Sequence, residues 1–408
     1  MGGGWAVLKL ARCWVLAALC ALGVTLVLTA GASGAATTTL ATCDYVTVSS
    51  QEAQFIAPRF KWVVTGDDTA PARIHALNRR VRLLKYFDAL FTGQSETGYR
   101  VSEYLTDPER MSRLEPTGKR WLLYAMDVTN PEWRATAVAR TRTAISKGFN
   151  GMMLDEVRGD LADPLLPPLK PVIGPPYTNV PSWYSKSAYQ QGMRQLLEDV
   201  REAAPHKTVL YNGITPLAQS NGLEYEPYTS GASAEGWVYN DHFGQGYATG
   251  DLWSRFMNVA LAAPSSKLLG ITSYGPVDDV RARIYSLASY LLVSHANTAF
   301  YYTPECDRLT YLPEWELSLG KPKGAVRSLS DLQLLAGQVY GRVFTHGLVL
   351  VNPADTSAPS IHLDKSYSLA TLSGGNVPAL GGNGIASLVP TSSVQLAPHS
   401  AALLISHH

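Results

Sequence analysis

The chain has 408 residues, of which 46% are hydrophobic and 16% charged, and its formal net charge at pH 7 is +1. This is the composition of a globular protein with a sizeable core, and it excludes a disordered or polyelectrolyte chain. The near-neutral charge, without a basic stripe, argues against a nucleic-acid partner. Aromatic residues make up 10% of the chain and suit stacking against a neutral partner such as a sugar. The length allows one α/β domain of about 250 residues with a small companion.

The N-terminus has the order of segments found in a secretory signal peptide. Lys9 and Arg12 precede an apolar run from Trp14 to Leu28, and small residues follow over positions 30–36. This pattern predicts a signal peptide over residues 1–36 and a secreted or extracytoplasmic protein. The apolar run is long enough for an uncleaved anchor, which is the alternative. A membrane partner is expected only in that case.

Two of the four cysteines remain after the predicted signal peptide. Cys13 and Cys20 lie inside it, whereas Cys43 and Cys306 belong to the exported chain. An oxidising compartment would allow a disulfide between Cys43 and Cys306, but their spacing does not show that the Cα atoms are close. Two isolated cysteines do not form a zinc site, and no metal or other cofactor is predicted.

Predicted strands and helices alternate along the body of the chain. Strands are predicted within residues 61–65, 82–87, 121–126, 148–157, 208–211, 231–238, 267–273 and 298–302. Helices are predicted over residues 72–80, 133–147, 185–204, 251–263 and 278–294. Eight parallel strands joined by helical crossovers predict a (β/α)8 TIM barrel over residues 50–335. A doubly wound open sheet is the alternative, but it calls for a glycine-rich phosphate loop that the sequence lacks.

The pattern changes near residue 337. Short alternating runs follow, separated by turn residues such as Gly374-Gly375-Asn376. They predict a small C-terminal antiparallel β-sandwich domain over residues 337–408. A proline-rich segment over residues 163–181 follows the fourth predicted strand and leaves from the catalytic face of the barrel.

Carboxylates at the ends of predicted strands indicate the chemistry. The C-terminal ends of barrel strands form the catalytic face, and Asp127, Asp155, Glu156 and Glu235 lie near such ends. Hydrolysis of a glycosidic bond needs two carboxyl groups flanking that bond. Asp155 is preferred over Glu156, because side chains alternate along a strand and only one of the two easily points over the barrel mouth. Asp155 and Glu235 are therefore the predicted catalytic residues.

Other polar and aromatic residues near strand ends are candidates for binding substrate. They are Asp127, Tyr86, Tyr124, Tyr211, Asn212, Trp237 and Tyr274. Structural roles compete with these predictions. Asp127 could hold the turn at Thr129, Glu235 could form a buried ion pair, and His242 is more readily explained as a loop histidine than as a base.

Three segments resemble a known family. They are Met126 to Arg134, Gly148-Phe149-Asn150-Gly151 leading into Leu154-Asp155-Glu156-Val157, and Ala234-Glu235-Gly236-Trp237. They resemble the glycosyl hydrolase-like TIM barrels, especially hypothetical glycosyl hydrolase family 15. By similarity to barrels whose nucleophile follows the fourth strand and whose acid/base follows the sixth, the resemblance implies that Asp155 is the nucleophile and Glu235 the acid/base.

The predicted function is an exported glycoside hydrolase that cleaves O-glycosidic bonds in a polysaccharide or glycoconjugate, with retaining chemistry favoured. Its predicted partner is a carbohydrate substrate. The alternative from another class is a non-catalytic carbohydrate-binding or surface-attached barrel protein. The distance between Asp155 and Glu235, which decides between retaining and inverting chemistry, is not in the sequence.

Overall fold

The computed structural model describes residues 38–43, 47–93, 112–114, 120–159, 185–217, 221–242, 244–335, 338–376 and 384–406. The side chains of residues 43, 112–114 and 120–124 lie outside this description. The predicted signal peptide and the proline-rich segment 163–181 also lie outside the described residues. Within the described ranges, no helix is long and apolar enough to cross a membrane.

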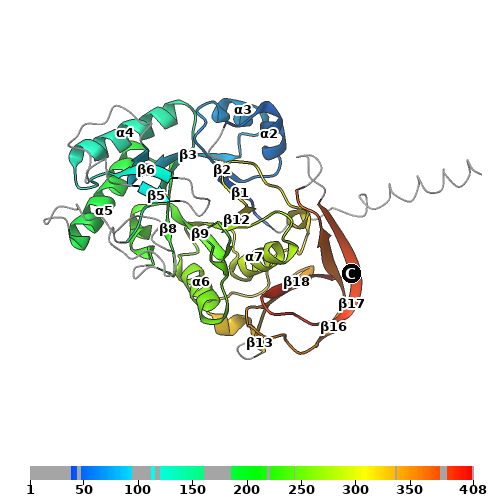
Figure 1. Cartoon of the computed structure of the whole chain (residues 1–408). Helices are drawn as coiled ribbons and strands as arrows, with labels where there is room; N and C mark the ends of the chain where they lie inside the picture. The colour runs from blue at the N-terminus through cyan, green and yellow to red at the C-terminus, as the bar shows by residue number, and fades with distance from the viewer. Residues whose placement is uncertain are drawn as a thin grey trace, which may run out of the picture.

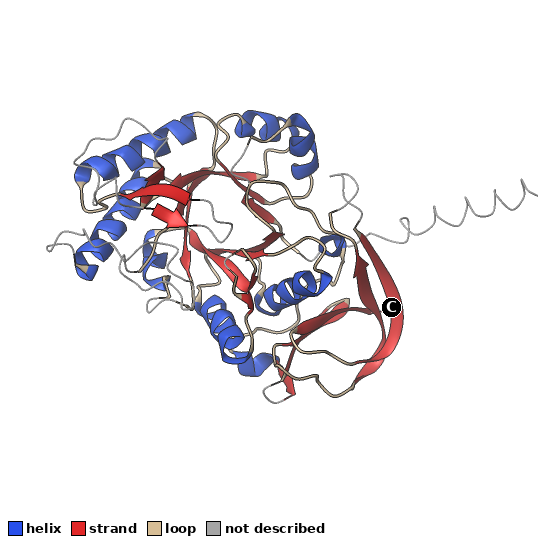
Figure 2. Ribbon diagram, viewed as in Figure 1, coloured by secondary structure: helices blue, strands red, loops and turns tan. Residues whose placement is uncertain are grey.

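Eight parallel strands form a closed barrel, as predicted. In sheet order they are β1 (Ala41–Cys43), β2 (Trp62–Thr65), β3 (Arg82–Asp88), β7 (Gly151–Asp155), β8 (Thr208–Ile214), β9 (Gly231–Asn240), β11 (Leu268–Tyr274) and β12 (Thr298–Thr303). The ring closes beside β1 and β12, where Leu40 bridges Phe300 in parallel and Phe300 N donates to Thr39 O at 2.9 Å. A short strand, β10 (Gly246–Tyr247), pairs antiparallel with β9. Figures 1 and 2 show the ring of strands with helices outside it.

Helices connect most of the barrel strands. They are α2 (Ser50–Ile56), α3 (Ala70–Leu77), α4 (Pro131–Ser146), α5 (Lys186–Ala203), α6 (Gly250–Ala262) and α7 (Val280–Val293), with a 3₁₀ helix η2 (Leu223–Tyr228) between β8 and β9. The five predicted helices are confirmed with small shifts of their ends. In α4, the Asn130 side chain accepts a hydrogen bond from Glu132 N at 2.8 Å, and Pro131 occupies the first turn.

One predicted barrel strand is wrong, and one barrel strand was not predicted. The segment predicted over residues 121–126 is β6 (Arg120–Ala125), which pairs antiparallel with β4 (Phe91–Gly93) and β5 (Ser112–Leu114) in a separate sheet of order β4-β6-β5. Strand propensity shows that a segment is extended but does not identify its partner. The eighth place in the ring belongs to β1, whose three residues are too few to show an alternating pattern. Asp155 and Glu235 still lie on the fourth and sixth barrel strands.

The barrel interior is packed by side chains and is not an open channel. Trp62, Val64, Leu84, Met153, Leu210 and Ala299 form a buried cluster inside the ring. A larger cluster fills the space between the outside of the strands and the helices.

The C-terminal strands form a six-stranded antiparallel sheet, which confirms the predicted antiparallel architecture. The sheet order is β13 (Gln333–Leu335), β14 (Val339–Phe344), β15 (Gly347–Asn352), β18 (Ser400–Ser406), β16 (Ile361–Ser373) and β17 (Ile385–Val394). It encloses a core of its own that includes Leu350, Tyr367 and Leu404. Two 3₁₀ helices, η3 (Pro313–Glu316) and η4 (Leu329–Leu332), precede it.

Helix α7 joins the barrel to this sheet. It packs against β9 and β12 on the barrel side and against β14, β15 and β18 on the other, and Figure 1 shows it between the two. Arg342 of β14 donates to the carbonyl oxygens of Leu291, Leu292 and Ser294 at 3.1, 2.9 and 2.7 Å. These carbonyls lie at the C-terminal end of α7, which intrahelical bonds leave unsatisfied.

The ion pair between Arg283 of α7 and Glu314 of η3 is expected to matter for stability. Both side chains are fully buried, and Arg283 donates to Glu314 Oε1 at 2.9 Å and Oε2 at 2.7 Å. Replacing Arg283 by Met leaves a buried carboxylate without its counter-charge, which costs about 3–5 kcal/mol of unfolding free energy. Urea unfolding of Arg283→Met measures this loss. The double variant Arg283→Met/Glu314→Leu is expected to recover most of it; a double variant as unstable as the single one contradicts the explanation.

Candidate active site

The C-terminal ends of five neighbouring barrel strands bring the site together. They contribute Tyr86 from β3, Asp155 from β7, Asn212 from β8, Glu235 from β9 and Tyr274 from β11. Parallel strands in register place their ends on one edge of the sheet. The register pairs Asp88 with Asp155, Asn212 with Ser233 and Thr272 with Glu235. The site is therefore on the face where TIM-barrel active sites lie.

Asp155 accepts three hydrogen bonds. Tyr86 Oη donates to Oδ2 at 2.7 Å, and both Asn212 Nδ2 and the backbone N of Glu156 donate to Oδ1 at 2.8 Å. The carboxyl group is half-buried at the last residue of β7. Three donors fix its orientation and favour its ionised form.

Asn212 links the two predicted catalytic carboxyl groups. Its Nδ2 carries two hydrogens, one directed to Asp155 Oδ1 at 2.8 Å and one to Glu235 Oε2 at 2.5 Å. Since both acceptor oxygens lie at 2.8 Å and 2.5 Å from one nitrogen, they are at most about 5.3 Å apart. The two carboxyl groups thus face each other across a narrow gap.

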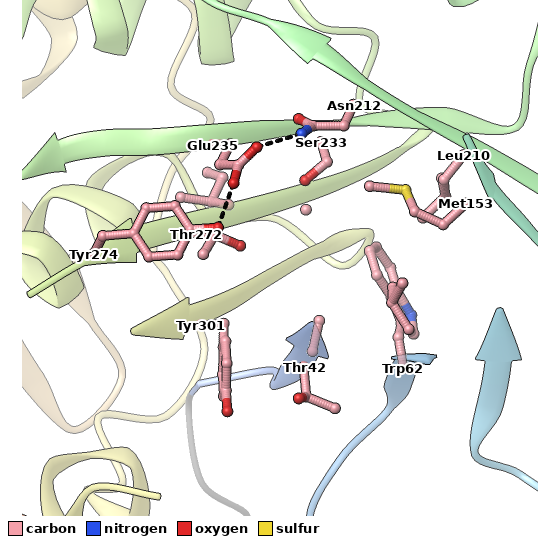
Figure 3. Close-up of a pocket in the computed structure, with 14 residues that line it drawn as sticks. Thr42, Trp62, Met153, Leu210, Asn212, Ser233, Glu235, Thr272, Tyr274 and Tyr301 are labelled. Carbon is pink, nitrogen blue, oxygen red and sulfur yellow. Dashed lines mark hydrogen bonds between the residues drawn. The ribbon is translucent and has the colours of Figure 1, made fainter. Parts of the chain in front are cut away.

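Glu235 lies between Asn212 and Tyr274, as Figure 3 shows. Tyr274 Oη donates a short hydrogen bond to Glu235 Oε1, opposite the bond that Asn212 makes to Oε2. Strand β9 is irregular directly after Glu235: its register to β11 shifts between Thr272 and Tyr274, and Gly236 has φ of 66°. A Cβ at Gly236 would meet Asn240 Nδ2 at 2.3 Å, so this turn of the backbone requires glycine.

The site concentrates negative charge. Burial raises the pKa of Asp155 to about 7, and the charges of Glu156 and Glu235 add to the effect, while the hydrogen bonds from Tyr86 and Asn212 oppose it. Burial also raises the pKa of Asp88 well above its ordinary value, helped by the charges of Glu156 and Asp155. Carboxyl groups so close to one another do not all ionise together at neutral pH.

A cavity inside the barrel extends from Glu235. Its polar end is formed by Asn212, Ser233, Glu235, Thr272 and Tyr274. Its inner wall is formed largely by apolar side chains, including Trp62, Met153, Leu210 and Ile271. Figure 3 shows Trp62 and Tyr301 on the side of the cavity opposite Asn212. Of the two catalytic candidates, Glu235 lines this cavity.

The structure brings some of the predicted site residues together and separates others. Asp155, Glu235, Tyr86, Asn212 and Tyr274 form one connected network. Tyr211 points away from it, because its fully buried side chain donates to Gly222 O at 2.7 Å. Trp237 is 1% exposed and packs against Phe256 with ring centroids 5.6 Å apart, so it offers no open stacking surface.

Asp127 falls outside this network. Asp127 Oδ1 accepts from Thr129 N at 2.9 Å and from Thr129 Oγ1 at 2.6 Å, which is the structural alternative considered for it. The side chain of Tyr124 lies outside the described part of the structure. His242 lies next to the network, with its ring 5.5 Å from that of Tyr274.

Sequence reasoning missed Asp88, the positive φ of Glu156 and the position of Cys306 beside Tyr274. Asp88 ends β3 and is in register with Asp155, so the strand-end argument that selected Asp155 also applies to Asp88. Glu156 forms an ion pair with Arg158. Its backbone has φ of 58°, and no residue type in the sequence indicates this turn. Cys306 is disulfide-bonded and lies beside Tyr274. The side chain of its predicted partner, Cys43, is outside the described part.

A closed (β/α)8 barrel with two facing carboxyl groups at the ends of its fourth and sixth strands defines a TIM-barrel protein of the glycoside hydrolase class. The family comparison agrees. The chain belongs to hypothetical glycosyl hydrolase family 15, whose model matches residues 75–348. This confirms the family resemblance and makes the chain a glycoside hydrolase.

Several solved glycoside hydrolases are similar to this chain. The glycoside hydrolase domain of PelA from Pseudomonas aeruginosa has 16% identity and a TM-score of 0.43, covering 67% of this chain and 97% of that one. Ega3 from Aspergillus fumigatus, in complex with galactosamine, has 11% identity and a TM-score of 0.38, covering 66% and 92%. The α-amylase from Geobacillus thermoleovorans, in complex with acarbose, has 11% identity and a TM-score of 0.43, covering 87% and 90%. Among curated proteins, none matches.

Proposed function

We propose that the protein is an exported, retaining glycoside hydrolase in which Asp155 is the nucleophile and Glu235 the acid/base. The observation that carries the proposal is the Asn212 bridge, which limits the nearest oxygens of the two carboxyl groups to at most about 5.3 Å. Retaining enzymes separate their carboxyl groups by about 5–5.5 Å, whereas inverting enzymes need about 6.5–9.5 Å to admit a water.

The hydrogen bonds around each carboxyl group support this division of roles. Asp155 receives three donors, which favour its ionised form against the burial that raises its pKa and which aim the carboxylate for attack. Glu235 contacts the Tyr274 hydroxyl, which accepts as well as donates and is therefore compatible with a protonated Glu235. The surroundings of Asp155 suit a nucleophile, which must be charged. The surroundings of Glu235 suit an acid, which must hold a proton.

The reaction proceeds in two steps. An Asp155 oxygen attacks the anomeric carbon, the bond to the leaving oxygen breaks, and the proton of Glu235 passes to that oxygen. A glycosyl ester on Asp155 results. Glu235 then takes a proton from a water whose oxygen attacks the anomeric carbon, and Asp155 leaves as a carboxylate. Two displacements at one carbon retain its configuration.

The proposed substrate is a polysaccharide or glycoconjugate outside the cell. A near-neutral net charge suits an uncharged sugar. The N-terminal order of positive, apolar and small residues supports export, with a retained anchor as the alternative. In this proposal residues 50–335 form the catalytic domain, and residues 337–408 form a C-terminal β domain.

A panel of 4-methylumbelliferyl glycosides, in both anomers of the common hexoses and N-acetylhexosamines, tests the proposal alongside polysaccharide digests scored for reducing ends. Release of fluorophore or reducing sugar by the wild type, and none by Asp155→Asn, is the expected result. Glycan binding without turnover, with equal affinity in both proteins, instead indicates a non-catalytic binding protein.

Activity is expected to fall on the acid side of neutrality. Asp155 must be ionised to attack, and its pKa is raised to about 7, so kcat/KM decreases as pH drops below that value. Well below the midpoint the decrease is about tenfold per pH unit. A profile of kcat/KM against pH measures this acid limb, and circular dichroism at each pH shows whether the fold persists. Undiminished activity at pH 5 contradicts an essential carboxylate with so high a pKa.

A further inference from the structure

Positive charge gathers on the face of the barrel opposite the candidate active site. This face carries the N-terminal ends of the parallel strands. The segments that enter β1, β2 and β3 are adjacent there, because Arg82 N donates to Lys61 O and Lys61 N donates to Leu40 O, both at 2.9 Å. Residues 57–61 and 78–82 supply five cations and no carboxylate. We call these five side chains the basic patch: Arg59, Lys61, Arg79, Arg80 and Arg82.

No carboxylate neutralises the basic patch within the part of the chain that the structure describes. None of its five side chains forms an ion pair there. Neighbouring cations of the same region are paired: Arg73 of α3 lies 3.1 Å from Asp67, and Lys85 of β3 lies 2.8 Å from Asp68. The basic patch therefore differs from its surroundings in lacking counter-charges.

The cations of the patch also act on one another. Partial burial lowers the pKa of Lys61, and the charge of Arg82 lowers it further. Burial likewise lowers the pKa of Arg82, whose guanidinium lies 6.0 Å from the centre of the Trp62 ring. A nearby anion favours the charged form of such groups. All members of the patch except Arg82 are exposed, so an anion can reach them from solvent.

Two features favour a membrane surface as the source of that anion. Leu77, the last residue of α3, is 53% exposed and directly precedes the segment 78–82, so an apolar side chain accompanies the cations. The chain also enters the barrel at this face. The apolar run from Trp14 to Leu28 ends ten residues before Thr38, the first described residue. Ten residues span at most about 35 Å, so a retained N-terminal segment would keep this face near the lipid.

We propose that the basic patch is a docking surface for anionic lipid headgroups, which turns the catalytic face of the barrel away from the membrane and toward the glycan. The proposal rests on the export proposed above and not on hydrolysis. Guanidinium groups donate to the lipid phosphates, and Leu77 enters the interface between headgroups and acyl chains. Each Lys or Arg at an anionic membrane surface strengthens binding about fivefold.

Arginine footprinting of the full chain in lipid nanodiscs tests this orientation. Phenylglyoxal modifies accessible guanidinium groups, and mass spectrometry measures each arginine separately. Modification of Arg79 and Arg80 is expected to be at least about fivefold slower on phosphatidylcholine mixed with phosphatidylglycerol than on phosphatidylcholine alone. Arg308 follows β12 on the catalytic face and has a side chain 63% exposed, so it is expected to react equally on both. Salt at about 1 M is expected to abolish the difference.

A pair of double variants separates the patch from net charge. Arg59→Gln/Lys61→Gln leaves the two reporter arginines in place, and it is expected to lose most of the slowing, because two of five charges are gone. The matched control is Lys186→Gln/Lys365→Gln, which removes two exposed cations from α5 and β16. The control is expected to keep the slowing seen in the wild type.

Equal reactivity of the reporter arginines on both lipids at low salt overturns the proposal. So does a slowing that both double variants lose equally, because net charge alone would then explain it. Protection by soluble alginate on neutral nanodiscs, as strong as that by anionic lipid, would assign the patch to an anionic polysaccharide instead. The footprint needs no turnover, so an inactive wild type, which contradicts the proposed function, is distinguishable from a failure of this inference.

Discussion

An Asp155→Asn variant is expected to fold normally and to lose at least about 10⁴ of its kcat, because it lacks the nucleophile. Asparagine fits the site: its oxygen can accept from Asn212 Nδ2 and Glu156 N, while its Nδ2 donates to Tyr86 Oη, which turns to accept. The measurement is steady-state hydrolysis of the substrate that the glycoside panel identifies. Full activity in a folded Asp155→Asn protein excludes Asp155 as the nucleophile.

The matched control is Asp68→Asn. Asp68 also follows a barrel strand, β2, but it pairs with Lys85 at 2.8 Å and Lys147 at 2.6 Å and not with another carboxylate. Its removal is expected to leave hydrolysis as in the wild type. A comparable loss of activity in both variants would mean that any strand-end aspartate supports the fold of the site, and the nucleophile assignment would lose its basis.

The stability of Asp155→Asn has its own signature. The native state holds the Asp155 proton more tightly than the unfolded chain, since the pKa is raised to about 7. Native stability therefore decreases as pH rises from about 4 to about 7, and above 7 it carries the full penalty of the ionised group. Asparagine avoids this penalty, so the variant gains on the order of 2 kcal/mol over wild type at pH 8 and little at pH 4. Unfolding in urea at the two pH values measures the difference.

A Glu235→Gln variant is expected to lose activity in a way that depends on the leaving group. Glycosides with a poor leaving group need the proton of Glu235, so their turnover falls by about 10²–10⁴. Glycosides with an activated leaving group, such as dinitrophenolate, need no proton in the first step, and their glycosylation rate falls much less. Comparison of the two substrate types, by pre-steady-state release of the leaving group, measures this difference.

The opposite pattern would contradict the assignment. An equal loss for both substrate types indicates that Glu235 does not act as an acid.

The structure also identifies what glutamine changes: its Oε1 still accepts from one neighbour, but its Nε2 hydrogens face either Asn212 or Tyr274. Of these, only the Tyr274 hydroxyl turns to accept, so glutamine is expected to place its nitrogen toward Tyr274.

Much of the barrel was predictable because strand and helix periods differ clearly. Seven of its strands coincide with predicted ones, since runs such as Gly151–Asp155 are apolar, short and bounded by turn residues. The exchange of β1 for β6 was not predictable. Both segments are extended, and only the partners, Trp62 to Val64 for β1 and residues 91–93 for β6, distinguish a barrel strand from a side sheet.

The site was predictable where strand alternation holds. Asp155 ends β7, and Asn212 lies in β8 before the register of that strand shifts, so their inward direction follows from the two-residue period. The same alternation argues against Tyr211 as a substrate-binding residue. Tyr211 precedes the inward-facing Asn212 and therefore points outward. Trp237 follows the turn at Gly236, and the next residue, Val238, has φ of 30°, so alternation fails there and the direction of Trp237 could not be derived from spacing.

The central claim, that Asp155 carries the glycosyl group, is tested most directly by trapping. Glu235→Gln protein is incubated with dinitrophenyl glycosides of the sugar identified in the panel, quenched in acid and digested with trypsin, which cuts after Lys147 and Arg158. Mass spectrometry is expected to show the peptide of residues 148–158 heavier by one glycosyl unit, with fragmentation placing the adduct on Asp155. An unmodified peptide during turnover, or an adduct on Glu156, contradicts the account.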